Sequence, residues 1–68
     1  MTEIEDALKI AMTALKEKNL RYRNEFRLTA SRVGSEWVFW FVFLPPTEGM
    51  DVTVMVGDDG NIRTLVGM

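Results

Sequence analysis

Neither cysteine nor histidine occurs among the 68 residues, which removes most of the side chains that perform chemistry in proteins. Disulfides, thiol nucleophiles, histidine bases, haem ligands and the usual zinc sites are excluded together. Carboxylates, arginines and aromatic rings remain as candidates. No catalytic constellation can be assembled from them, so the sequence predicts a protein that is not an enzyme and that needs no cofactor and no metal.

The densest carboxylate cluster, Asp58-Asp59-Gly60-Asn61, has the composition of a calcium-binding segment. It lacks the alternating ligands and the distal glutamate of a calcium loop. Glycine and aspartate are also the residues that a tight turn requires, and we interpret the segment as a turn. Paired carboxylates for acid/base catalysis would need a pocket. The acids here fall in turns and on the polar side of a helix, where solvation is their expected role.

Four arginines, Arg21, Arg23, Arg27 and Arg32, lie in one short segment. Arg21, Tyr22, Arg23 and Arg27 could form a site for single-stranded nucleic acid, with Trp40 as a stacking platform. The net charge of −2 and the uniformly negative charges from residue 36 to residue 59 argue against nucleic acid. The alternative is that residues 25–33 form an edge strand whose charges prevent aggregation between sheets.

The elements that position these residues are organised around residues 36–44, which hold both tryptophans and three of the four phenylalanines. Aromatic and β-branched side chains favour a strand, and the run is too short to cross a membrane as a helix. We therefore expect a central strand of an antiparallel sheet.

A helix is predicted for residues 3–18. Thr2 and Glu5 fit a capping box, and Asn19 suits a left-handed stop. Ile10 is the one apolar residue expected on the wrong side. The apolar residues recur at helical spacing and should form the buried stripe: Ile4, Ala7, Leu8, Ala11, Met12, Ala14 and Leu15.

After a connection at residues 20–24, alternation with a period of two predicts strands at residues 25–33, 51–56 and 62–66 beside the central strand. Gly34-Ser35 suits a two-residue type II′ turn. The order is one helix followed by a four-stranded antiparallel meander. We expect a single α+β domain spanning residues 1–68, with the helix packed on one face of the sheet in two layers, α-β-β-β-β.

The register follows from the turns and the apolar pattern. Val33 should lie opposite Glu36, Phe43 opposite Val52, and Val56 opposite Ile62. The face toward the helix then carries Phe26, Leu28, Ala30, Phe39, Phe41, Phe43, Val52, Val54, Val56, Ile62 and Val66. The other face carries Arg27, Thr29, Ser31, Val38, Trp40, Val42, Thr53, Met55, Arg63 and Leu65.

This second face is more apolar than a solvated face should be. Trp40 is expected opposite Met55 and Thr29, with the Arg27 guanidinium stacked on its indole ring. Exposed sheet faces do tolerate a tryptophan and some valines. Trp, Met and Arg are, however, enriched at protein interfaces, so we favour an interaction site. Its predicted residues are Val38, Trp40, Val42, Met55, Leu65 and Arg27.

With this order in place, the chain resembles the cystatin-like small α+β domains, and within them the NTF2-fold immunity protein family of bacterial toxin systems. The resemblance covers residues 26–67. It is carried by the tryptophan-led strand 37–44 with Pro45, Gly49, the valine-rich strand 52–56, the turn Asp59-Gly60-Asn61-Ile62, and Gly67. It implies a binding protein that neutralises a partner and has no catalysis of its own. PepSY-type domains, which share the helix and meander, are the second resemblance and imply a sensor or inhibitor that binds an extracytoplasmic partner.

A chain of this size buries only about 60% of its unfolded surface and gains from an association partner. We therefore expect a second copy or another protein as partner, and no membrane. The N-terminal run has no signal-peptide core, which favours a cytoplasmic location.

Overall fold

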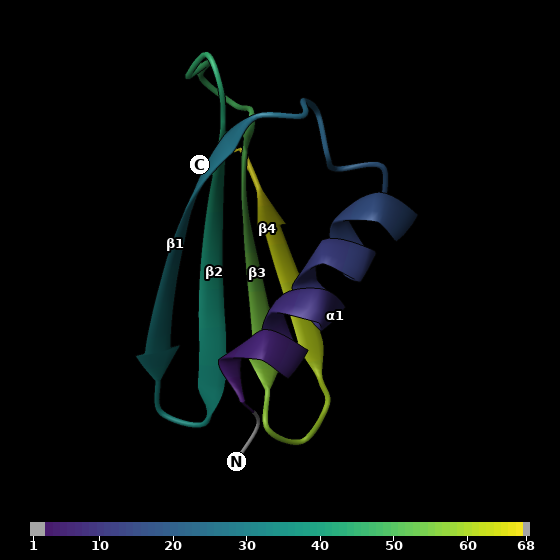
Figure 1. Cartoon of the computed structure of the whole chain (residues 1–68), viewed down its shortest axis with the longest axis vertical. Coiled ribbons are helices and arrows are strands. Elements are labelled where there is room, and N and C mark those ends of the chain that lie inside the picture. Colours follow the sequence, from purple (N-terminus) through teal and green to yellow (C-terminus); the bar gives the residue numbers. More distant parts are fainter. Residues whose placement is uncertain (1–2, 68) are drawn as a thin grey trace.

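The computed structural model describes residues 3–67 and shows the expected α-β-β-β-β order (Figure 1). All four strands form one antiparallel sheet in the order β1-β2-β3-β4. The elements are α1 (Ile4–Glu17), β1 (Phe26–Val33), β2 (Glu36–Phe43), β3 (Asp51–Gly57) and β4 (Ile62–Val66). The chain is therefore an α+β domain with a helix layer and a sheet layer, as predicted.

Helix α1 ends as the sequence predicts. Asn19 adopts a left-handed conformation with φ of 56°, and its N–H donates to the carbonyl of Lys16. The N–H of Leu20 donates to the carbonyl of Leu15 at 2.8 Å, which completes a Schellman motif. At the other end the N-cap residue is Glu3, without a side-chain capping bond. The predicted capping box depends on Thr2, which lies outside the described residues.

The outer hairpins have the predicted register. Val33 pairs with Glu36 across Gly34-Ser35, and Gly34 has φ of +58° while Ser35 does not have positive φ, as a type II′ turn requires. In the last hairpin Val56 pairs with Ile62. The pairing of both outer hairpins, and the backbone dihedral of Gly34 in the first, therefore agree with the prediction.

The predicted register between β2 and β3 is wrong by two residues. Val52 lies opposite Phe41 instead of Phe43, and Trp40 lies opposite Thr53 instead of Met55. A slip of two residues leaves every side chain on its original face, so the apolar pattern that excludes a one-residue slip cannot detect it. The connection at residues 44–50 sets the register, and its length alone does not specify where pairing resumes.

Helix α1 is too small to cover the sheet, and it packs on β2 and β3 (Figure 1). The fully covered residues all come from these three elements: Ala7, Ala11, Ala14, Leu15, Phe39, Phe41, Phe43, Val52, Val54 and Val56. The outer strands point apolar side chains toward the helix layer as predicted, but the helix does not cover them. Leu28, Ala30, Ile62 and Val66 are consequently exposed, which corrects the expectation that they are buried.

The buried side of α1 is rotated from the predicted one. Ile10, expected to face solvent, is half-buried against the core, whereas Ile4 is exposed. The helix therefore turns slightly toward β4. Helix α1 has 14 residues, and no helix within residues 3–67 is long and apolar enough to cross a membrane.

Candidate functional site

The candidate site lies on the sheet face opposite α1, which we call the outer face. Since α1 is the one helix within residues 3–67, no second layer of helix covers this face. Strand alternation brings the predicted apolar residues together there, and we call them the outer patch: Val38, Trp40, Val42, Met55 and Leu65. Trp40 is 46% exposed and Leu65 is 49% exposed, while the other three are half-buried.

The corrected register defines how the outer patch is arranged. Trp40 lies midway along β2, with Thr29 on β1 and Thr53 on β3 on either side of it and Leu65 beyond Thr53 in the same row on β4. Val38 and Met55 are direct cross-strand partners in the neighbouring row. The patch therefore spans three adjacent strands, with Thr53 between Trp40 and Leu65, and these two are its most exposed side chains.

Trp40 is held by a hydrogen bond that the sequence analysis missed. Its indole Nε1–H donates to the Asp51 carboxylate Oδ2 at 3.1 Å. The predicted stacking of Arg27 on Trp40 is wrong, because among residues 3–67 the arginines that lie over aromatic rings are Arg21 and Arg32. The alternation of side chains along β3 could have placed Asp51 on the outer face, but no feature of the sequence predicts its hydrogen bond to Trp40.

Charged residues surround the outer patch with both signs. Arg63 donates to the Glu36 carboxylate at 2.6 Å, so its side chain reaches back over the outer face rather than along the free edge of β4. Arg27 is exposed in the same row as Val42 and Asp51. Within the range 3–67 it forms no ion pair, because the two ion pairs there belong to Arg32 and Arg63.

The other arginines of the basic segment point elsewhere and hold the fold together. Arg23 donates to the carbonyl of Pro45 at 2.7 Å, which ties the helix–strand connection to the loop before β3. Arg32 lies over the Trp37 ring at 5.4 Å and forms a bidentate pair with Asp58. The hydrogen bond that Arg32 donates to the Asp58 carboxylate raises the pKa of Arg32 further above its ordinary value. The sequence does not show these structural roles, and only Arg27 of the four lies on the outer face.

The acidic turn predicted after β3 is a turn in the structure. The N–H of Asn61 donates to Asp59 Oδ1 at 3.0 Å, and the N–H of Gly60 donates to the carbonyl of Gly57. The Asp59 carboxylate thus stabilises the backbone of the turn in which it lies. In the part of the chain that the structure describes, no three acidic residues gather closely enough to hold a metal ion.

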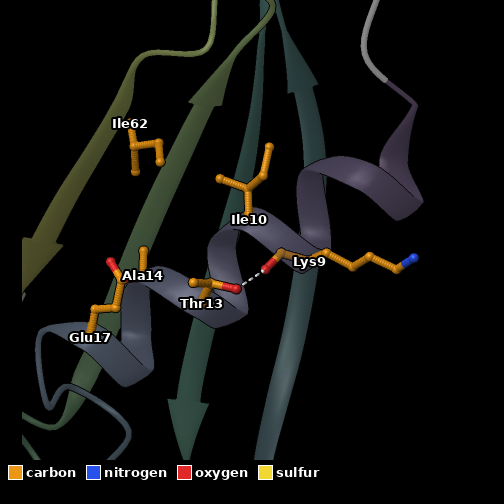
Figure 2. Close-up of a pocket in the computed structure, with 6 residues that line it drawn as sticks. All are labelled: Lys9, Ile10, Thr13, Ala14, Glu17 and Ile62. Carbon is orange, nitrogen blue, oxygen red and sulfur yellow. Dashed lines mark hydrogen bonds between the residues drawn. The ribbon is translucent and has the colours of Figure 1, made fainter.

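A shallow groove of about 350 Å³ lies on the other side of the molecule, between α1 and β4 (Figure 2). Ile10 and Ala14 approach Ile62 across it, while the Lys9 side chain extends away. Thr13 does not offer its hydroxyl proton to a ligand, because it donates to the Lys9 carbonyl at 2.9 Å. The groove is apolar and lacks the convergent polar groups of a small-molecule site.

Comparisons of the chain with protein-family models, with curated proteins and with solved structures each return no match. The functional argument is therefore built on the residues and their geometry.

Proposed function

We propose that this chain is a non-catalytic protein-interaction module that docks through its outer face. The observation that carries the proposal is the position of Trp40, which lies between Val38 and Val42 in the outer patch and is 46% exposed on a face that no helix within residues 3–67 covers. Tryptophan at the centre of an apolar patch with a charged rim is the usual arrangement of an interface hot spot.

The bond between Trp40 and Asp51 supports the same function. A tryptophan that is fixed in one orientation before binding loses less conformational entropy when a partner covers it. The neighbours Val38 and Val42 are β-branched and have few rotamers. The outer patch is therefore preorganised, as an interface should be.

The resemblance to the NTF2-fold immunity proteins, whose members neutralise a partner without catalysis, agrees with this proposal and stays a prediction. Nucleic-acid binding has less support, because Arg23 and Arg32 are occupied by contacts within the chain. If nucleic acid were the partner, binding would fall steeply as salt rises, whereas burial of an apolar patch is insensitive to salt.

The experiment compares the mass in solution of wild type, Trp40→Ser and Leu28→Ser by light scattering at low and high salt. Leu28 is the matched control, because it is a large apolar residue, 38% exposed, on the opposite face of the sheet. We expect wild type and Leu28→Ser to associate at both salt concentrations, and Trp40→Ser to stay at the monomer mass of 7.8 kDa. Monomeric wild type would contradict self-association through the outer face, and equal loss in both variants would contradict the outer face as the site.

A further inference from the structure

We infer that the free edge of β4 binds an extended peptide segment of another protein. The segment adds to the sheet as a further strand and places its apolar side chains at the groove beside α1. This site goes beyond the proposed function, because it uses the edge of the sheet and its helix side instead of the outer patch. The partner is recognised through its backbone and through apolar residues at alternating positions.

The backbone of β4 presents hydrogen-bonding groups to solvent, since within residues 3–67 no strand lies beyond β4. The N–H of Gly57 donates to the Asn61 carbonyl at 2.8 Å, which sets the order of hydrogen bonds along the β3–β4 ladder. Hydrogen-bonded and non-hydrogen-bonded pairs alternate in an antiparallel ladder, so Arg63 and Leu65 are the residues of β4 that bond to β3. The alternate residues direct their N–H and C=O groups to the free edge: Ile62, Thr64 and Val66.

The free edge of β4 lacks the features that normally prevent a strand from pairing. Edge strands are usually protected by charged side chains or by proline. β4 contains no proline, and its single charged residue, Arg63, extends over the outer face to Glu36. Its edge-facing residues are β-branched, a class that favours strands. The opposite edge, β1, is better protected because it carries Arg27 and Arg32.

The groove between α1 and β4 lies where side chains of an added strand would point. Ile62 belongs to the free edge and also lines the groove, together with Ile10 and Ala14 of α1 (Figure 2). Residues directly opposite each other in an antiparallel pair have their side chains on the same face of the sheet. A peptide residue opposite Ile62 therefore points toward α1. The edge and the groove thus select the same ligand, an extended chain with apolar residues at alternating positions.

The residues around this edge favour a neutral, apolar segment. Lys9 and Glu17 are the charged residues that line the groove, and their charges cancel. At the two ends of the edge, Ile62 is 42% exposed and Val66 is 46% exposed. Apolar residues opposite these two positions would remove that apolar surface from water, which is favourable.

The size of the site favours a peptide over a second copy of the chain. β4 has five residues, so its edge is roughly 17 Å long, and with a sheet about 10 Å thick it projects about 170 Å². A stable protein interface buries roughly 600 Å² or more per partner, which two chains meeting along this edge alone do not reach. A peptide that adds a strand depends instead on main-chain hydrogen bonds and on side chains placed in a pocket.

The test titrates the ¹⁵N-labelled chain with a synthetic peptide in which valine and threonine alternate over about seven residues, flanked by one lysine and one glutamate. We expect the backbone amide signals of Ile62, Thr64 and Val66 to shift, and their hydrogen exchange to slow in the bound state. The same peptide N-methylated at its valines should bind roughly tenfold more weakly or worse, because it has lost the donors that pair with β4.

A pair of proline variants locates the site on the protein. Thr64→Pro removes an N–H that faces away from β3, so the β3–β4 ladder is kept. Ala30→Pro is the matched control on the edge of β1, because the Glu25 carbonyl accepts from the Leu44 N–H and alternation then turns the Ala30 N–H outward. Thr64→Pro should weaken peptide binding by roughly tenfold or more, and Ala30→Pro should bind like wild type.

Circular dichroism verifies that both proline variants are folded, and if Thr64→Pro is not, the N-methylated peptide decides. Absence of amide shifts at millimolar peptide, or shifts centred on β1 or on the outer patch, overturns the inference. Edge amides of β4 that become protected in the free chain as its concentration rises would overturn it too, because a second copy would then occupy the edge. Each of these failures leaves the proposed function of the outer face standing.

Discussion

At the scale of single residues, Trp40 and Phe41 are adjacent in the chain and have opposite roles. Phe41 is fully buried beneath α1, whereas Trp40 is half-exposed on the outer face. The difference comes only from strand alternation, which sends successive side chains to opposite faces. Phe41 therefore stabilises the fold, whereas we propose that Trp40 contacts a partner.

Phe41→Ala should lower the free energy of unfolding by about 3–5 kcal/mol, because it leaves a cavity in a core that cannot collapse around it. Trp40→Ser should cost about 1 kcal/mol in the monomer, since it removes one exposed hydrogen bond to Asp51 and little buried area. Urea unfolding of both variants, at concentrations low enough to keep the chain monomeric, measures the difference. Equal destabilisation would show that the faces have been assigned wrongly.

The residue scale is also where the sequence was least informative. Alternation and the apolar pattern placed Trp40 and Leu65 on the outer face correctly. The hydrogen bond from Trp40 to Asp51 and the position of Arg32 over Trp37 depend on side-chain directions that no periodicity encodes. Arg27 was therefore given a stacking role that the structure does not show.

At the scale of elements, the end of α1 depends on one backbone conformation. Asn19 has positive φ, which asparagine tolerates and most residues do not. The Schellman bonds to Lys16 and Leu15 fix the chain as it leaves the helix. That exit directs residues 20–25 over the end of the sheet and into β1, as Figure 1 shows.

Asn19→Ala should therefore destabilise the chain by roughly 1–2 kcal/mol, the cost of holding an L-residue with a Cβ in the left-handed region. Asn19→Gly is the matched control and should be close to neutral, because glycine adopts positive φ without that cost. Thermal unfolding of the two variants gives the comparison. A glycine variant as unstable as the alanine variant would mean that the asparagine side chain, and not its backbone, is important here.

Element order and strand faces were predictable because the apolar periods change clearly, from helical spacing in residues 4–15 to alternation from residue 26 onward. The pairing of β2 with β3 was not predictable, because a two-residue slip preserves both faces. The extent of cover by α1 was not predictable either. Leu28 and Val66 have the pattern of buried residues, and only the path of the helix across the sheet exposes them.

At the scale of the whole molecule, one short helix and four strands leave apolar surface on both sides of the sheet. On the helix side the exposed residues flank α1 and are divided by it. On the outer side they are contiguous across β2, β3 and β4. A contiguous patch can be buried by a single partner, which is why the outer face carries the proposed function.

The most direct test of that claim follows the fluorescence of Trp40 in a Trp37→Phe background, where it is the only tryptophan. Phenylalanine retains an aromatic ring next to Phe39 and beneath Arg32. As the protein concentration rises, the emission of Trp40 should shift to shorter wavelength and become less accessible to a neutral quencher, because a partner covers the indole. Emission and quenching that stay constant over the concentration range in which the mass increases would contradict an interface centred on Trp40.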